Sequence, residues 1–288
     1  MPPGVPRRPA RAFPRPGRIV TSFVERWPPV LRRYLEVAPL AWALPRSAEA
    51  VLLADTPLEP PVLDVGCGDG LFAELSDRLR GAVGVDLGSR EVRRAAHRGI
   101  YRATVQADAA RLPFATGSFA TVVSISSLEH MTDLDRVLAE LARVLRPGGR
   151  LVFSVPGPEI ATAMFWPRIL RRLGLGRASR AYEGLVNGCF HHHNLFPRED
   201  WSRRLGALGL SLVGAHDFKP PRAAMLQDLS LPTAIVPAAL RRLTGSWVLW
   251  PRWRRVAGRA LAAAVGPFLA RDRRPGTNLF LCAERGAT

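Results

Sequence analysis

The sequence predicts an α/β protein whose core is a doubly wound, mostly parallel, seven-stranded sheet. Three observations support this fold class. Short apolar segments alternate with amphipathic segments between residues 61 and 156, which is typical of right-handed βαβ units. A glycine-rich turn joins the first apolar segment to the first helical one. Two later strand-like segments, 210–218 and 277–283, are expected to extend the sheet.

The alternation assigns the central elements in order. Strands are expected where apolar runs end in turns, at 61–66, 82–86, 101–107, 119–126 and 150–155. Helices are expected where apolar residues recur every three or four positions, at 71–80, 89–98 and 133–145. The last of these helices is the most clearly amphipathic, and the proline and glycines at 147–149 are expected to end it.

The rest of the chain surrounds this centre. Residues 19–60 are expected to form a helical cover of two or three short helices, broken near Pro28–Pro29 and near Pro39. The main domain is expected to span 61–288. Two helical insertions in it are expected to form a lid, at about 157–197 and 219–276.

The composition is that of a globular protein, with 47% hydrophobic residues and a formal charge of +17. Residues 1–18 hold six prolines and five arginines, which predicts a disordered cationic tail. Residues 61–156 are nearly neutral, with 12 basic and 11 acidic side chains, whereas 157–288 carry 20 and 8. Lys219 is the only lysine among the 41 basic residues. The positive charge therefore belongs mainly to the insertions, and coding bias toward arginine weakens a simple nucleic-acid interpretation.

Other sequence signals concern the compartment. Three scattered cysteines are too few for a disulfide framework or a zinc site. The N-terminus has no apolar segment typical of a secretory signal, and no uncharged apolar run is long enough to span a bilayer. We therefore expect a cytoplasmic protein, with docking on a membrane surface left open.

The segment 62–70 carries the main chemical motif, a strand that ends in G-x-G-x-G. A dinucleotide site normally has a third glycine where this chain has Leu71. Asp64 also ends the strand, and a carboxylate is a poor neighbour for a pyrophosphate. Asp86 follows at the tip of the second strand, where a carboxylate can accept hydrogen bonds from ribose hydroxyls. Asp108 closes the third strand, where it can accept a hydrogen bond from an adenine amino group. The motif therefore favours a cationic nucleoside without phosphates.

With these three acids in order, the sequence resembles the class I S-adenosylmethionine-dependent methyltransferases, in particular their small-molecule and lipid branch. Further matching segments are 112–114, 127–130 and 141–149. Ala120 departs from the family, which often has aspartate there. The resemblance implies a Rossmann-like fold and S-adenosylmethionine as cofactor. It also implies these cofactor-binding residues: Asp64, Gly66 and Gly68 at the methionine end, Asp86 and Leu87 at the ribose, Asp108 and Ala109 at the adenine, and Ser126 at the exit of the methyl group. No metal site is expected, because three adjacent histidines at 191–193 cannot all point one way and no cysteine or carboxylate lies at useful ligand spacing from them.

The resemblance implies methyl transfer to a small or lipid-like acceptor, with oxygen favoured over nitrogen or carbon. A hydroxyl acceptor must lose a proton, and His130, which follows the fourth strand, is the first candidate base. His193 is the second, as a wall of the acceptor pocket. For both, a structural histidine is the alternative. Two rival functions stay open, an RNA methyltransferase and a non-catalytic module that keeps the cofactor fold.

The second insertion is rich in tryptophan and arginine. Trp247, Trp250 and Trp253 lie three residues apart beside arginines, a combination that suits the boundary between lipid and water. We therefore expect docking on an anionic membrane or capture of a greasy acceptor. The alternative is an ordinary helical cap with packed tryptophans and solvated arginines. A nucleic-acid partner is disfavoured, because long apolar stretches interrupt the basic residues and no RNA-binding module is recognisable.

Overall fold

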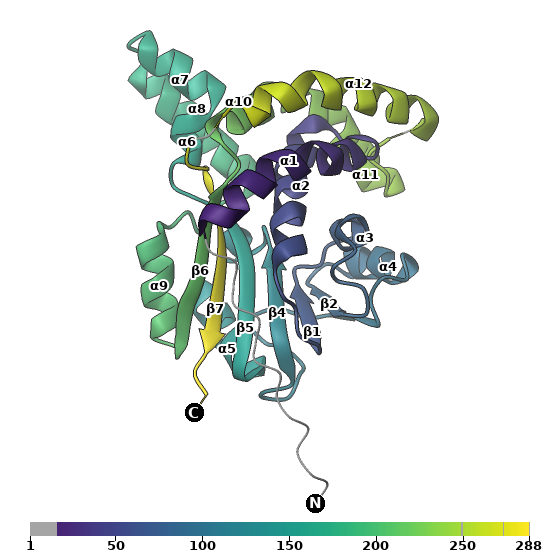
Figure 1. Ribbon diagram of the computed structural model, residues 1–288, viewed down its shortest axis with the longest axis vertical. Coiled ribbons are helices and arrows are strands. Elements are labelled where there is room, and N and C mark those ends of the chain that lie inside the picture. Colours follow the sequence, from purple (N-terminus) through teal and green to yellow (C-terminus); the bar gives the residue numbers. More distant parts are fainter. Residues whose placement is uncertain (1–15, 249, 273, 288) are drawn as a thin grey trace, which may run out of the picture.

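The computed structural model describes residues 16–248, 250–272 and 274–287 (Figure 1). The expected tail at 1–18 lies outside these residues, except for 16–18, which begin the first helix.

Seven strands form one sheet in the order β3-β2-β1-β4-β5-β7-β6. Neighbouring strands are parallel except at β7, which runs antiparallel to β5 and to β6. The predicted seven-stranded, mostly parallel sheet is therefore confirmed. The strands span Val62–Val65 (β1), Val83–Asp86 (β2), Ala103–Gln106 (β3), Phe119–Ile125 (β4), Leu145–Pro156 (β5), Leu210–Phe218 (β6) and Asn278–Arg285 (β7).

Successive residues of a strand point to opposite faces of the sheet, and here each face has its own core. Val122 of β4 belongs to the core beneath α5 (Leu134–Val144) and α9 (Arg198–Gly206). Val123 belongs to the core beneath α1 (Pro16–Leu35), α2 (Leu40–Asp55) and α12 (Pro251–Ala270). The helices next to the central strands span Leu71–Ser76 (α3), Ser89–His97 (α4), Leu128–His130 (the short 3₁₀ helix η1), Leu134–Val144 (α5) and Arg198–Gly206 (α9). The sheet is thus covered on both faces, as a doubly wound fold requires.

Strand β5 begins five residues before its predicted start at 150. Its pairing with β4 passes from Phe119↔Leu145 to Thr121↔Arg150, so 146–149 form a bulge within the pairing. Helix α5 ends at Val144, as the proline and glycines that follow it predict. These turn-forming residues therefore mark a strand irregularity and not a loop.

The N-terminal cover consists of two helices, Pro16–Leu35 (α1) and Leu40–Asp55 (α2). The break expected at Pro28–Pro29 is wrong, because α1 continues through both prolines. Buried Trp27 and Tyr34 lie on either side of them, and Trp27 Nε1 donates a 2.8 Å hydrogen bond to Ser47 Oγ of α2. Packing against α2 therefore offsets the backbone hydrogen bonds that the prolines remove. The break at Pro39 is confirmed.

Both insertions are helical and gather, with α1 and α2, at the carboxyl ends of the parallel strands (Figure 1). Whether they move as a lid stays a prediction. Within the described residues no single helix is long and apolar enough to cross a membrane. The segments Pro221–Ser230 and Pro232–Thr244, which meet at a bend of 56°, reach that length and hydropathy only when they are taken together. The inserted helices span Ile160–Ala163 (α6), Phe165–Arg172 (α7), Gly176–Phe190 (α8), Pro221–Ser230 (α10), Pro232–Ala234 (η2), Ile235–Thr244 (α11) and Pro251–Ala270 (α12).

Candidate active site

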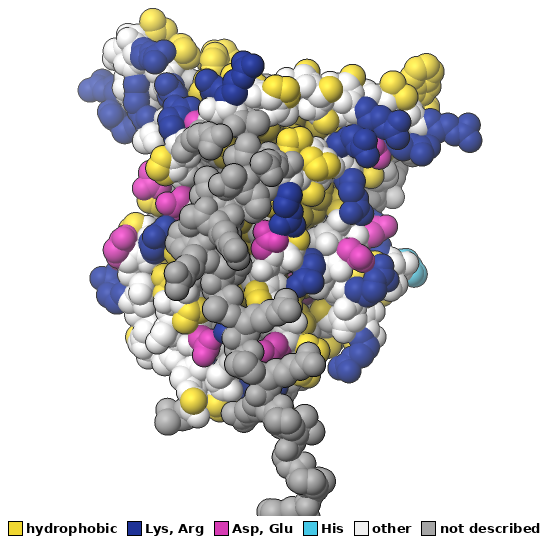
Figure 2. All heavy atoms as spheres, in the orientation of Figure 1, with side chains coloured by type: hydrophobic (Ala, Val, Ile, Leu, Met, Phe, Trp, Pro, Cys, Tyr) yellow, Lys and Arg dark blue, Asp and Glu magenta, His cyan; other side chains and the backbone are white. Residues whose placement is uncertain are grey.

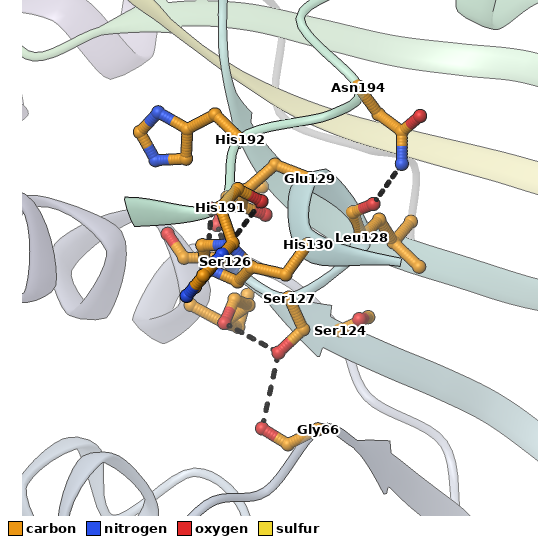
Figure 3. Close-up of polar contacts among 12 residues, drawn as sticks. Gly66, Ser124, Ser126, Ser127, Leu128, Glu129, His130, His191, His192 and Asn194 are labelled. Carbon is orange, nitrogen blue, oxygen red and sulfur yellow. Dashed lines mark hydrogen bonds and ion pairs between the residues drawn. The ribbon is translucent and has the colours of Figure 1, made fainter. Parts of the chain in front are cut away.

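The glycine-rich loop joins β1 to α3 and touches the end of β4. Gly66 has a φ of +78°, and a Cβ atom there would lie 2.1 Å from Ser127 Oγ. The absence of a side chain lets Ser127 Oγ approach and donate a 3.2 Å hydrogen bond to the Gly66 carbonyl oxygen (Figure 3). Gly68 also has a positive φ, and a Cβ there would meet nothing within 4 Å. The loop therefore presents bare backbone beside open space.

The close approach of Gly66 and Ser127 gives a stability prediction. Gly66→Ala is expected to lower the free energy of unfolding by about 3 kcal/mol, since it combines an unfavourable φ with a steric clash. Gly81→Ala is the matched control, because Gly81 has a φ of +79° but a Cβ there would meet nothing within 4 Å. Urea unfolding of both variants measures the difference. Equal losses of unfolding free energy in the two variants would show that Ser127 moves aside for the added methyl group.

Asp86, at the end of β2, is held by two backbone N–H groups. Gly68 N–H donates to its Oδ2 at 2.8 Å, and Gly88 N–H donates to its Oδ1 at 2.9 Å. A carboxylate oxygen can accept more than one hydrogen bond, so both oxygens keep acceptor capacity for a ligand. Leu87 follows with a side chain that is 70% exposed. The carboxylate is thus oriented by the same loop that leaves open space at Gly68.

The neighbouring strand adds the third predicted acid. Asp108 follows β3 and is exposed, and Ala110 N–H donates to its Oδ1 at 2.9 Å. Gln106 pairs with Asp86 across the two strands, and its Nε2 donates to the Leu87 carbonyl oxygen at 3.3 Å. The strand ends that carry Asp86, Leu87 and Asp108 therefore lie next to each other.

Asp64 is placed differently from the other two acids. It is buried in β1, and the Tyr101 hydroxyl donates a 2.5 Å hydrogen bond to its Oδ2. Burial raises the pKa of Asp64 to about 7, and the charge of nearby Asp86 also acts to raise it. Asp64 therefore already has a partner within the protein, and its contact with a cofactor stays a prediction.

A second cluster of polar side chains lies where β4 and β5 end. Its centre is a carboxylate that sequence reasoning did not identify. Glu49 of α2 is fully buried. Its Oε1 accepts hydrogen bonds from Ser126 Oγ and, at 2.8 Å, from Ser154 Oγ. Arg46, one turn earlier on α2, forms a 3.1 Å ion pair with its Oε2. Ser126, predicted at the methyl exit, is therefore bonded to the N-terminal cover.

Two more buried ionisable groups, Glu129 and Lys219, complete this buried polar cluster. Lys219 is 1% exposed, has a φ of +58° and donates a 2.9 Å hydrogen bond from Nζ to Gln227 Oε1 of α10. Burial lowers its pKa to about 7, although the charges of Glu49 and Glu129 act in the opposite direction. Burial also raises the pKa of Glu129 to about 8, and its Oε2 has no hydrogen-bond partner among the described residues. Arginine cannot release a proton here, whereas lysine can.

The predicted histidines lie beside this cluster. The rings of His130 and His192 are stacked 5.5 Å apart, and His130 Nδ1 lies 3.3 Å from the His191 carbonyl oxygen (Figure 3). Burial lowers the pKa of His130 and lowers that of His192 to about 4. The backbone N–H of His193 donates to the Glu129 carbonyl oxygen at 2.8 Å. The structure thus pairs His130 with His192 and leaves the His193 ring outside that pair.

Sequence reasoning did not single out Glu49, Glu129 or Lys219, and within the histidine run 191–193 it chose His193 and not His192. Lys219 had one usable signal, because it is the only lysine in an arginine-rich chain. Within the described part of the chain, no group of three or more histidine, cysteine, aspartate or glutamate side chains is placed to hold a metal ion.

Comparison with known proteins gives consistent findings. Residues 63–153 match the family model described as a methyltransferase domain. The malonyl-[acyl-carrier protein] O-methyltransferase of Geobacter sulfurreducens is 31% identical over 69% of this chain and 76% of its own length. The 27-O-demethylrifamycin SV methyltransferase of Amycolatopsis mediterranei is 39% identical over 34% of this chain and 40% of its own. The chain spans about half the length of the first curated relatives.

Among solved structures, the [4+2]-cyclase SpnF superposes with a TM-score of 0.54 at 21% identity, over 84% of this chain and 82% of its own. At this identity the likeness shows a shared fold alone. Because SpnF is named for a cyclisation, the fold by itself does not specify the reaction.

Proposed function

The chain belongs to the class I S-adenosylmethionine-dependent methyltransferases, and on that premise we propose that it transfers a methyl group to an oxygen atom of a small or lipid-like acceptor. The cofactor supplies the electrophilic methyl group on its sulfonium. The protein's task is then to bind the cofactor, align the acceptor and accept the acceptor's proton.

The residues at the carboxyl ends of β1, β2 and β3 fit such a cofactor. The Cβ-free backbone at Gly66 and Gly68 suits the methionine end, with Asp64 beneath the loop. The fixed carboxylate of Asp86 suits the ribose hydroxyls, because both its oxygens keep acceptor capacity. Exposed Leu87 offers an apolar surface to the nucleoside. For the adenine we propose Asp108 and Ala109.

The buried polar cluster supports an acceptor that must lose a proton, and it is the single observation that carries the oxygen assignment. Ser126 follows β4 and contacts Glu49, and Lys219 and Glu129 lie in the same cluster. A group whose pKa is about 7 can accept a proton near neutral pH, as Lys219 can. We keep His130 as a second candidate base, because its lowered pKa leaves it neutral at pH 7, and His193 as a candidate pocket wall.

Calorimetric titration with S-adenosylmethionine and S-adenosylhomocysteine tests the enzyme assignment. Saturable binding of both ligands supports the enzyme assignment. The absence of binding contradicts it and favours the rival function, a non-catalytic module. Incubation of the chain and a cell extract with methyl-labelled cofactor then tests the acceptor. Label in small molecules or lipids, as an ether or ester, supports the proposal, whereas label in RNA supports the rival methyltransferase.

The α11–α12 region favours a peripheral membrane location. Trp250 and Trp253 are 70% and 78% exposed, and Arg252 and Arg255 beside them are exposed too. Basic side chains gather at the same end of the molecule (Figure 2). Trp247 does not share this exposure, because it packs on Trp42 at 5.8 Å. The proposed membrane contact therefore uses two of the three tryptophans.

Replacing Trp250 and Trp253 together by serine is expected to reduce co-sedimentation with vesicles containing anionic phospholipid by roughly tenfold, since two large apolar groups are lost from the contact. Trp166→Ser is the control, because Trp166 is 44% exposed on α7 in the other insertion. Wild-type protein that stays in the supernatant, or a double variant that sediments like wild type, contradicts membrane docking.

A further inference from the structure

The helical cap contains a cavity that the proposed methyl-transfer residues do not line. Its volume is about 410 Å³, within the usual range of small-molecule sites. It lies between α2, α10, α11 and α12, and its walls are mostly apolar, with Leu40, Leu226, Leu229 and Leu261 among them. Among the described side chains that line it there is no carboxylate. The cavity therefore suits an apolar ligand body.

Two residues that line the cavity each carry a hydrogen-bond donor without an acceptor among the described residues. The Nε1 of Trp247 and the Nε of Arg254 are buried without a partner among the described residues. A terminal nitrogen of Arg254 donates a hydrogen bond to the Ala38 carbonyl oxygen at 2.5 Å. Within the described part of the chain Arg254 forms no ion pair, and burial lowers its pKa. A half-buried cation without a counter-charge and a buried N–H without an acceptor both favour an anion.

The two donors belong to one small region. Trp247 lies between Trp42, at 5.8 Å, and the guanidinium of Arg241, which lies 5.0 Å from the centre of its ring. Arg241 is already engaged by an ion pair with Asp69. Among the described residues that line the cavity, Arg254 is thus the half-buried cation that still lacks a counter-charge.

We propose that this cavity binds a single-chain amphiphile, with its apolar chain among the leucines and its carboxylate on Arg254 and Trp247. The apolar walls exclude a wholly polar anion, and the unpaired donors disfavour a neutral or cationic chain. The modest volume suits one acyl chain better than the two of a phospholipid. The exposed Trp250 and Trp253, next in sequence to the cavity wall, offer such a ligand an apolar approach.

The site has a direct connection to the buried polar cluster. Helix α10 lines the cavity with Leu226 and Leu229, and Gln227, which follows Leu226 in sequence, accepts the hydrogen bond of Lys219. An occupant of the cavity would therefore contact the same helix that accepts the hydrogen bond of Lys219.

Calorimetry with dodecanoate, below its micelle concentration and without cofactor, tests the proposal independently of methyl transfer. We expect one saturable site per chain and at least tenfold weaker binding of dodecyltrimethylammonium, which has the same chain length and the opposite charge. Arg254→Gln is expected to weaken dodecanoate binding tenfold or more, because a charge-assisted hydrogen bond is lost. Arg252→Gln is the control, since Arg252 is exposed on the same helix.

Trp247→Phe keeps an aromatic ring and removes the N–H, so it tests the headgroup contact even if Arg254→Gln perturbs the cap. We expect a several-fold loss of affinity for dodecanoate and none for the cationic amphiphile. The proposal is overturned if dodecanoate does not saturate, if both amphiphiles bind equally, or if Arg252→Gln weakens binding as much as Arg254→Gln.

Discussion

Asp86→Ala is expected to weaken S-adenosylmethionine binding by about a hundredfold. Two hydrogen bonds from ribose hydroxyls to a carboxylate are each worth roughly 1.5–3 kcal/mol, and about 1.4 kcal/mol corresponds to a factor of ten. The substitution also removes the acceptors that hold Gly68 and Gly88. The measurement is a calorimetric titration with cofactor.

Two further variants keep this test interpretable. Asp200→Ala removes a carboxylate that pairs with Arg203 on α9, at the β6 edge of the sheet and away from the glycine-rich loop (Figure 1). This variant is expected to leave cofactor affinity unchanged. Asp108→Ala removes a carboxylate that accepts from the Ala110 N–H, and a loss of about tenfold is expected. If Asp86→Ala melts like wild type and still binds with full affinity, Asp86 does not hold the ribose.

Glu129→Gln is expected to make the folded protein less sensitive to rising pH. The pKa of Glu129 is about 8 in the folded chain and 4.5 in its ordinary state. Between these values the folded state binds more protons than the unfolded state, so stability falls as pH rises. Integrated over this window the group costs wild type on the order of 4 kcal/mol. The variant lacks that cost, so its stability relative to wild type increases between pH 5 and pH 8.

Other buried groups also contribute to the pH dependence of stability, in both the variant and the wild type. Asp64 also has a raised pKa, and it contributes the same downward trend below pH 7 to both proteins. The pKa of Lys219 is lowered from 10.5 to about 7, so its own contribution to stability rises with pH above 7. Urea unfolding at pH 5, 6.5 and 8, with exposed Glu199→Gln as control, measures the contribution of Glu129 together with its electrostatic coupling to Lys219. A difference from wild type that is the same at all three pH values contradicts the raised pKa.

The central sheet was predictable because its signals are local. The β1 strand and the glycine loop after it lie within ten consecutive residues, 61–70, and β6 was predicted with its observed bounds. The bulge in β5 was not predictable, because Pro147 and Gly148 are as typical of a turn as of a strand irregularity. The local sequence shows where a regular element is interrupted. Whether the interruption is a turn or a bulge depends on the pairing with the neighbouring strand.

The buried polar cluster depends on contacts between distant segments. Ser126 and Glu49 are 77 positions apart, and Ser154, which also donates to Glu49, is 105 positions from it. No spacing rule relates such residues. The same holds for the tryptophans, because the packing of Trp42 distinguishes Trp247 from Trp250. For Pro28–Pro29, tertiary burial overrode a helix-breaking propensity.

The scarcity of lysine has a consequence for how the outer surface responds to its surroundings. Guanidinium groups stay protonated up to about pH 12. Apart from the contribution of six histidines, attraction of the surface to an anionic partner therefore keeps its strength across the physiological pH range. Ionic strength is then the variable that tunes such attraction, since mobile ions shield fixed charges over roughly 8 Å in physiological saline. Acidification, by contrast, acts in the interior, where the pKa values of Lys219, Asp64 and Glu129 lie near neutral pH.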